Sequence, residues 1–203
     1  YYTDNDVCNL IVRLCVRSPY DKVLDPACGS GTFLLNVYDR LLTLKKDDNP
    51  REKDNVLHKE ILKQIHAVEI NQFPAHLSVM QLALKNIKST TDKITVLVRD
   101  FFKTPHISLS ELETKGLGQS MPSRKIRGIP PTMNAIVGNP PYIRQESIKE
   151  KDFIRDRSLE QFKNYRYLVN GKSDIYVYFF LYGLTFLKEG GKFGFITSNS
   201  WLD

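Results

Sequence analysis

The sequence AIVGNPPY, residues 135–142, places an amide, two prolines and an aromatic ring directly after an apolar stretch. The NPPY part contains no carboxylate, thiol or serine nucleophile. It offers the side-chain oxygen of Asn139 and the carbonyl of Pro140 as neutral hydrogen-bond acceptors. Pro141 restricts Pro140 to extended backbone and so fixes the direction of that carbonyl. The ring of Tyr142 adds a stacking surface. Taken alone, the double proline also fits a polyproline turn or a docking ligand.

Three acidic residues also stand where apolar runs end, namely Asp25, Glu69 and Asp100. A carboxylate only accepts hydrogen bonds and can take two donors at once. Glu69 ends the second predicted strand, at the usual distance along the chain for an acid that accepts hydrogen bonds from both hydroxyls of a ribose. Asp100, beside a backbone N–H, suits the amino group and ring nitrogen of an adenine. One such acid is usually a cap or a surface residue, but three along one sheet edge indicate a binding site.

The turn LDPACGSGTFL, residues 24–34, follows the first apolar run and leads into a helical pattern. Gly29 and Gly31 permit a tight turn and a close approach of the backbone to a ligand. The turn lacks the lysine of a phosphate-binding loop and the third glycine of a dinucleotide fingerprint. Because it carries Asp25 in place of a phosphate cradle, it suits a cationic ligand with an amino acid end.

The elements that position these residues follow from the spacing of apolar side chains. Helices are expected at 4–17, 32–45, 52–64, 73–86 and 174–187, and strands at 22–25, 65–69, 94–98, 135–137 and 192–197. Gly190-Gly191 is expected to stop the last helix. Residues 103–132 show little periodicity, and 143–172 are polar and partly helical.

Strands that alternate with helices predict an α/β fold with a mostly parallel sheet, in which ligands bind at the carboxyl ends of the strands. The glycine turn, the three acids and NPPY all fall at such ends. The 203 residues suffice for one sizeable core. We therefore expect one domain over 1–203, read as a fragment of a longer protein.

The net charge of +6 is concentrated in two segments. Residues 103–134 contain five Lys or Arg and two Glu, and residues 144–172 contain eight Lys or Arg and five Asp or Glu. Because both segments flank NPPY, they predict an anionic partner, with nucleic acid first. The alternative is two solvated insertions kept soluble by charge, and charge alone does not separate the two interpretations.

The three cysteines, Cys8, Cys15 and Cys28, show no framework spacing and are expected to be free thiols in a cytoplasmic protein. Cys8 and Cys15 are seven residues apart and would share one buried helix face. No apolar stretch approaches the ~20 residues of a membrane span, so no membrane partner is expected.

The segments DPACGSGTFL, VEI, RDFF and NPPY occur in this order, with the spacing of motifs I to IV of a known enzyme family. The chain resembles the S-adenosylmethionine-dependent N6-adenine DNA methyltransferases of gamma motif order. Residues 173–202 resemble the motif V helix and motif VI strand, and YYT at 1–3 resembles the leading cofactor motif, with Asp4 in place of its usual proline. The insertions at 47–64 and 103–132 resemble the methylase part of type I or type IIG restriction–modification enzymes.

This resemblance implies a Rossmann-like class I methyltransferase sheet of seven strands, of which about five are present. The last strands and the target recognition domain would lie outside residues 1–203. It also implies S-adenosyl-L-methionine as cofactor and no metal. The cofactor-binding residues it implies are Tyr1, Thr3, Asp25, Ala27, Gly29, Gly31, Glu69, Ile70, Asp100 and Phe101.

By the same resemblance, the reaction is methylation of the N6 amino group of an adenine flipped out of DNA, with Asn139, Pro140 and Tyr142 as catalytic residues. The adenine amino group is a poor nucleophile because its lone pair is delocalised into the ring. Two neutral acceptors draw on its N–H bonds without placing a carboxylate beside the sulfonium of the cofactor. Tyr142 would stack on the base, a contact worth roughly 1–3 kcal/mol.

The expected partners are double-stranded DNA and a specificity or nuclease subunit or domain of the same system. DNA contacts are expected from Arg124, Lys125, Arg127 and Arg144. Two alternatives stay open. One is another NPPY methyltransferase, acting on a protein glutamine or on RNA, and the other is a non-catalytic DNA-binding subunit.

Overall fold

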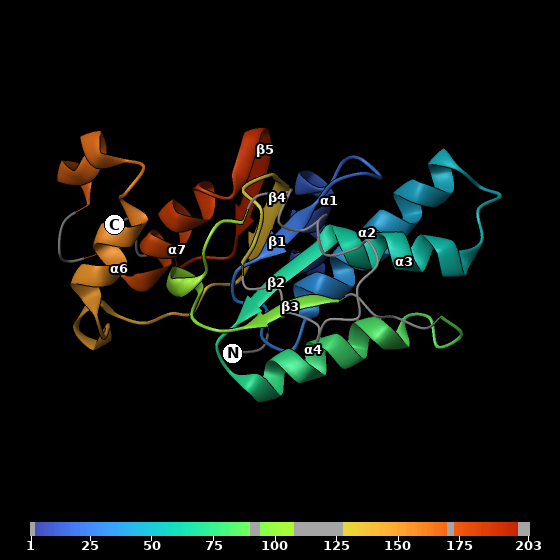
Figure 1. Ribbon diagram of the computed structural model, residues 1–203, viewed down its shortest axis with the longest axis horizontal. Coiled ribbons are helices and arrows are strands. Elements are labelled where there is room, and N and C mark those ends of the chain that lie inside the picture. The colour runs from blue at the N-terminus through green and yellow to red at the C-terminus, as the bar shows by residue number, and fades with distance from the viewer. Residues whose placement is uncertain (1–2, 90–93, 108–127, 170–172, 199–203) are drawn as a thin grey trace, which may run out of the picture.

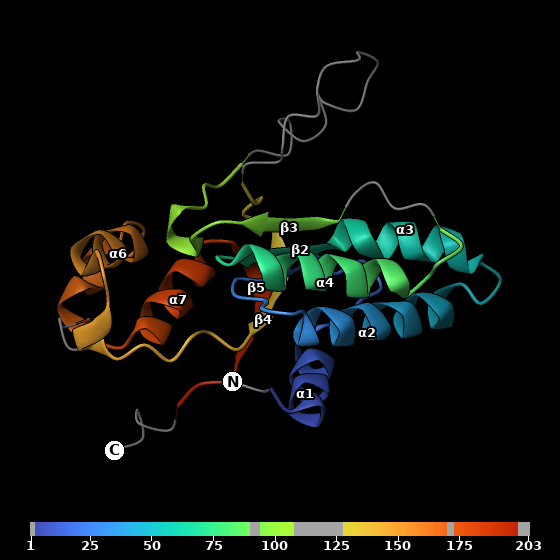
Figure 2. The same ribbon diagram turned by 90° about the horizontal axis from the view of Figure 1, so that it is seen from below.

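A computed structural model of the chain describes residues 3–89, 94–107, 128–169 and 173–198. A parallel β-sheet lies in the middle of the molecule, with helices packed on both of its faces (Figure 1). Helices α6 and α7 lie to one side of the strands, and α2 and α3 lie to the other side in both views (Figures 1 and 2).

The sheet contains five strands in the order β3-β2-β1-β4-β5, and every neighbouring pair is parallel. The strands are β1 (Val23–Asp25), β2 (Ile65–Glu69), β3 (Thr95–Val98), β4 (Met133–Gly138) and β5 (Leu187–Phe195). Because β1 lies between β2 and β4, the strand order reverses beside it. In open parallel sheets this is where ligands bind.

The longer helices are α1 (Asn5–Cys15), α2 (Thr32–Asp48), α3 (Asp54–Gln64), α4 (Gln72–Leu84), α6 (Lys151–Ser158) and α7 (Ile175–Leu184). Three short 3₁₀ helices are η1 (Phe101–Lys103), η2 (Gln145–Ser147) and η3 (Lys163–Leu168). Helix α1 begins with Asp4 as its N-cap, whose carboxylate accepts hydrogen bonds from the backbone N–H groups of Asp6 and Val7. Asp4 therefore has a structural role that the sequence motif did not indicate.

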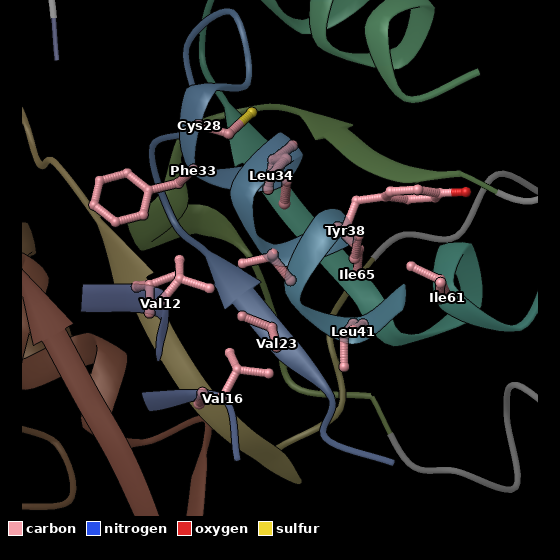
Figure 3. Packing of buried hydrophobic residues seen from close by; sticks show 14 of the residues in the cluster. Val12, Val16, Val23, Cys28, Phe33, Leu34, Tyr38, Leu41, Ile61 and Ile65 are labelled. Atoms are coloured by element: carbon pink, nitrogen blue, oxygen red, sulfur yellow. The ribbon is translucent and has the colours of Figure 1, made fainter. Parts of the chain in front are cut away.

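The sheet separates two hydrophobic clusters because successive strand residues point to opposite faces. On one face, Val23 and Ile65 pack against α1, α2 and α3, and Figure 3 shows Phe33, Leu34 and Leu41 filling this layer. On the other face, Leu24 and other strand residues pack against α7 and η1 in a cluster rich in aromatic rings. This second cluster contains Phe101, Phe102, Tyr178, Phe179, Tyr182 and Phe186.

The predicted α/β class and parallel sheet are confirmed, and β2 spans the five residues expected from the sequence. The predicted end of the last helix was wrong. Helix α7 ends at Leu184, and β5 already begins at Leu187. Gly190 and Gly191 therefore lie inside β5, within the register shift that separates the pairs Met133–Leu187 and Ala135–Lys192. Gly190 has φ 72°, which suits an irregular strand as well as a helix stop.

Candidate active site

The glycine turn after β1 depends on two residues with left-handed backbone. Gly29 has φ 52° and Gly31 has φ 101°. A Cβ on Gly31 would lie 2.9 Å from Cβ of Ser78 in α4, whereas a Cβ on Gly29 would meet nothing within 4 Å. Gly31 therefore permits the start of α2 to approach α4 closely, and Gly29 serves the turn itself.

Four backbone N–H groups of this turn donate hydrogen bonds inside the protein. Ala27 N donates to Asp25 Oδ1, Cys28 N to the carbonyl of Val68, Gly29 N to Glu69 Oε2 and Gly31 N to the carbonyl of Cys28. A phosphate-binding turn needs such N–H groups to point at its ligand. This arrangement agrees with the absence of a phosphate signature in the sequence.

Asp25, at the end of β1, is buried, and its Oδ1 accepts the N–H of Ala27 at 3.0 Å. Burial raises the pKa of Asp25 to about 7, and the nearby carboxylate of Glu69 adds to this rise. A Cβ on Gly138 would lie 2.8 Å from Asp25 Oδ1. The ends of β1 and β4 thus meet at this carboxylate, and a cationic ligand there would favour its ionised form.

Glu69, at the end of β2, links the turn to its own strand. Its Oε2 accepts the N–H of Gly29 at 2.9 Å, and its Oε1 accepts the N–H of Asn71 at 2.8 Å. These two bonds hold the carboxylate at the sheet edge. Each oxygen still has a lone pair for another donor, which fits the pair of ribose hydroxyls predicted from the sequence.

Asp100 and its neighbours follow β3. Asp100 is the N-cap of η1, and its Oδ1 accepts the N–H of Phe102 at 2.9 Å. Phe101 is only 3% exposed and stacks on Phe179, with ring centroids 5.3 Å apart. Ile70, another of the predicted cofactor-binding residues, is 64% exposed just beyond β2.

Asn139 follows the last residue of β4. Its Nδ2 donates to Oγ1 of Thr3 at 3.2 Å. Its Oδ1 is buried and has no hydrogen-bond partner within the part of the chain that the structure describes. Other buried polar atoms, such as Gln64 Oε1 and His66 Nδ1, also lack a partner among the described residues, but Asn139 Oδ1 lies just past the carboxyl end of a strand, where ligands bind in such sheets. The explanation that fits its position is a ligand that donates a hydrogen bond.

Pro140, the next residue, is buried, and Tyr142 is 39% exposed. The Tyr142 hydroxyl donates to the carbonyl of Ile196, just past β5, at 3.3 Å. This bond fixes one end of the ring and leaves part of its surface open to a planar ligand.

The basic segment after NPPY is less free to bind DNA than its composition indicates. Arg155, Arg157 and Arg166 form ion pairs with acids of the same segment. Arg144 is exposed at the start of η2. The other predicted DNA contacts, Arg124, Lys125 and Arg127, lie outside the described residues, as does Tyr1.

The described residues contain no group of three or more His, Cys, Asp or Glu side chains that could hold a metal ion. Among the helices of the described ranges, none is long and apolar enough to span a membrane. Cys8, Cys15 and Cys28 are buried free thiols, and Cys8 and Cys15 share the inner face of α1 as predicted.

Two contacts at the site were missed by sequence reasoning. Ser78 packs against Gly31, and the only sequence signal was a small residue among the bulky ones of α4. Thr3 was expected at the cofactor, but no sequence pattern indicated its hydrogen bond to Asn139.

The family model described as N-6 DNA Methylase matches residues 1–202. The chain is 27% identical over 183 residues to the type II methyltransferase M.PaeR7I of Pseudomonas aeruginosa, covering 89% of this chain and 27% of that protein. It is also 27% identical over 186 residues to M.XhoI of Xanthomonas vasicola, covering 89% of this chain and 29% of that protein. The chain thus spans less than a third of either relative.

Solved structures show the same fold at low sequence identity. A nuclease-deletion mutant of the type ISP restriction–modification enzyme LlaGI, in complex with a DNA substrate mimic, superposes with a TM-score of 0.64 at 18% identity. The match covers 100% of this chain and 18% of LlaGI. A structure from Listeria monocytogenes, described as a class I S-adenosylmethionine-dependent methyltransferase, superposes with a TM-score of 0.55 at 14% identity. That match covers 98% of this chain and 46% of the other.

Proposed function

Because the chain belongs to the N-6 DNA methylase family, we propose that it transfers a methyl group from S-adenosylmethionine to the N6 amino group of an adenine in DNA. The adenine is flipped out of the duplex to reach the site. Residues 1–203 then form the part of the catalytic domain that holds the cofactor and the target amino group, within a restriction–modification system.

The observation that carries this proposal is the buried Oδ1 of Asn139 just past the end of β4, which has no hydrogen-bond partner among the described residues. An exocyclic amino group supplies two N–H donors, and Asn139 Oδ1 would accept one of them. The carbonyl of Pro140 is the second acceptor, held in direction by Pro141. Together they draw the nitrogen toward tetrahedral geometry and make its lone pair available.

Neutral acceptors are suited to this step. A carboxylate in the place of Asn139 would form an ion pair with a cationic methyl donor and stabilise the ground state. Tyr142, with part of its ring exposed and its hydroxyl bonded to Ile196, would stack on the flipped base. Most of the remaining rate gain would come from holding the two reacting atoms in line.

The residues at the ends of β1, β2 and β3 fit the cofactor, which supplies an electrophilic methyl group on a positively charged sulfur. Asp25 offers a buried carboxylate beside the glycine turn, for the charged amino acid end. Glu69 retains lone pairs for two ribose hydroxyls, and Asp100 retains acceptor capacity for the amino group of the cofactor's adenine.

Duplex DNA and a further subunit or domain of the system are the proposed partners. Related proteins include the methylase subunit of the type I restriction enzyme EcoEI from Escherichia coli, and the structure of LlaGI contains a DNA substrate mimic. We assign backbone contacts to Arg144 and, outside the described residues, to Arg124, Lys125 and Arg127. Such contacts position a duplex without reading its sequence.

The direct test is methyl transfer from isotopically labelled S-adenosylmethionine by the intact protein. The substrate is genomic DNA from a bacterial strain that lacks its own DNA methyltransferases, with RNA and total protein in parallel reactions. Mass spectrometry of the digested DNA should find the label in N6-methyladenine. Label in methylcytosine, in RNA or in a glutamine side chain would contradict the proposal.

A further inference from the structure

The chain segment just before α1 reaches the end of β4, although the two are far apart in sequence. Thr3 is half-buried, and its Oγ1 lies 3.2 Å from Nδ2 of Asn139. A hydroxyl oxygen accepts hydrogen bonds, and a side-chain amide nitrogen only donates them. The contact therefore ties the nitrogen end of the amide to the N-terminal segment.

Thr3 is held in place by the residues that follow it. The carboxylate of Asp4 caps α1 through bonds to Asp6 N at 2.8 Å and Val7 N at 3.2 Å. Asn5 is bonded through its Oδ1 to Nδ2 of Asn36 in α2 at 2.9 Å. These bonds fix the direction in which the chain enters the helix, directly after Thr3.

The amide of Asn139 has a donor end and an acceptor end of nearly the same shape. Turning it by 180° about the bond to Cβ would exchange Oδ1 and Nδ2. In the observed orientation, Nδ2 is bonded to Thr3 and Oδ1 is buried without a described partner. In the turned orientation, the nitrogen would face the target and could not accept a hydrogen bond from an amino group.

We propose that Thr3 is a positioning residue that selects the reactive orientation of the Asn139 amide. By accepting the N–H of Nδ2, its hydroxyl keeps Oδ1 directed toward the target amino group. The inference rests on the proposed function, because it assigns Oδ1 the role of acceptor for that amino group. It assigns Thr3 to the methyl-transfer step, in addition to the cofactor contact implied by the sequence resemblance.

The two roles of Thr3 predict different kinetic changes. A residue that orients Asn139 affects the rate of the methyl-transfer step at saturating cofactor and DNA. A residue that only contacts the cofactor affects the KM or Kd for the cofactor and leaves the saturated rate unchanged. Single-turnover kinetics of the intact protein separate these cases, because product release does not limit them.

The experiment compares Thr3→Val, which keeps the shape and removes the hydroxyl, with Thr3→Ser, which keeps the hydroxyl. Thr43→Val is the matched control, since the Thr43 hydroxyl donates to the Asp39 carbonyl of its own helix and has no other hydrogen bond to a described residue. The saturated single-turnover rate should fall about 3–10-fold in Thr3→Val, as expected for one lost hydrogen bond. Thr3→Ser and Thr43→Val should stay within about twofold of the wild type.

A saturated rate in Thr3→Val equal to that of the wild type would overturn the inference, whether or not its cofactor KM changes. Equal losses in Thr3→Ser and Thr3→Val would overturn it too, because the hydroxyl would then be irrelevant. If Thr3→Val does not fold, Thr3→Ala takes its place with the same criteria. Asn139→Ala in the same assay separates a failure of the proposed function from a failure of the role of Thr3. Retained turnover in Asn139→Ala would contradict the proposed function itself. Lost turnover in Asn139→Ala with unaffected Thr3 variants would overturn only the role of Thr3.

Discussion

The two halves of the sheet edge differ in whether their polar acceptor atoms already accept hydrogen bonds from the protein. On the side of β1, β2 and β3, the carboxylates accept hydrogen bonds from backbone N–H groups that follow the same strands: Asp25 from Ala27, Glu69 from Asn71 and Asp100 from Phe102. At the end of β4, Asn139 Oδ1 is buried and has no partner among the described residues. The first half is held in shape by the protein itself, and the second presents an acceptor that a ligand must satisfy.

This difference assigns cofactor binding to the carboxylates and the methyl-transfer step to Asn139. Carboxylates that are already hydrogen-bonded are oriented before a ligand arrives, which reduces the ordering cost of binding. An unsatisfied buried acceptor costs roughly 1–3 kcal/mol, a cost that a ligand removes when it donates a hydrogen bond to the acceptor. We therefore expect changes in the carboxylate half to alter cofactor affinity, and changes at Asn139 to alter turnover.

The largest effect on turnover is expected from Asn139→Ala. Removing this acceptor should lower the methyl-transfer rate by at least about 100-fold, the usual effect of deleting one preorganised hydrogen-bonding group from a reacting centre. Asn134→Ala on the same strand is the matched control, because Asn134 Oδ1 already accepts the N–H of Lys22 at 3.0 Å.

The two asparagine variants should show opposite patterns. Asn134→Ala should keep its turnover and lose about 1 kcal/mol of folding stability, since it deprives Lys22 N of its partner. Asn139→Ala should keep its folding stability within about 1 kcal/mol in chemical denaturation, because deleting the unsatisfied Oδ1 offsets the loss of the Nδ2 bond to Thr3. Equal turnover in Asn139→Ala and Asn134→Ala would remove the distinction between the two halves of the edge.

A smaller effect is expected from substitutions in the glycine turn, this time on folding stability. Gly31→Ala would combine left-handed backbone with a contact of 2.9 Å to Ser78 Cβ and 3.2 Å to its Cα, and should cost about 2–4 kcal/mol. Gly29→Ala, which also has positive φ but meets nothing within 4 Å, should cost about 1–2 kcal/mol. Equal melting temperatures for the two variants would show that the approach of α2 to α4 is not as close as described.

A further effect concerns pH and the carboxylate half. Burial raises the pKa of Asp25 to about 7 in the folded chain, whereas an unfolded aspartate titrates near pH 4. Between these values the folded state holds a proton that the unfolded state has lost. Folding stability should therefore fall as pH rises from about 4 to about 7. Asp25→Asn should remove most of this dependence in urea titrations.

The affinity for the cofactor should change with pH in the opposite direction to folding stability. A cationic ligand prefers the ionised Asp25, so its affinity should rise by about tenfold between pH 6 and pH 8. Calorimetry on Asp25→Asn, which cannot ionise, corrects for any proton that the cofactor itself gains or loses. An equal rise with pH in both proteins would mean that Asp25 does not face the cation.

The sequence allowed much of this site to be predicted, because its residues follow strands with clear patterns. The β2 run Ile65-His66-Ala67-Val68-Glu69 is buried throughout, so its limits and the position of Glu69 were predictable. Gly190 was interpreted as a helix stop because positive φ at a glycine serves both a stop and an irregular strand. Periodicity alone does not distinguish these two uses.

The contacts that set the chemistry were not predictable from local pattern. Thr3 and Asn139 are 136 positions apart, and the orientation of an amide depends on a partner that only the fold brings near. The approach of Ser78 to Gly31 depends likewise on how α2 and α4 pack. In the basic segment 144–172, composition indicated free cations, but several arginines are paired with neighbouring acids.

The most direct test of the central claim measures whether Asn139 Oδ1 binds the target amino group. Once sequencing of methylated genomic DNA has identified the modified site, duplexes are prepared with either adenine or purine at the target, since purine lacks only the amino group. The ratio of adenine-duplex to purine-duplex affinity should be about 3–10-fold higher for the wild-type protein than for Asn139→Ala, because the weaker pairing of purine with thymine eases base flipping equally for both proteins. The same preference for adenine in both proteins would contradict the account.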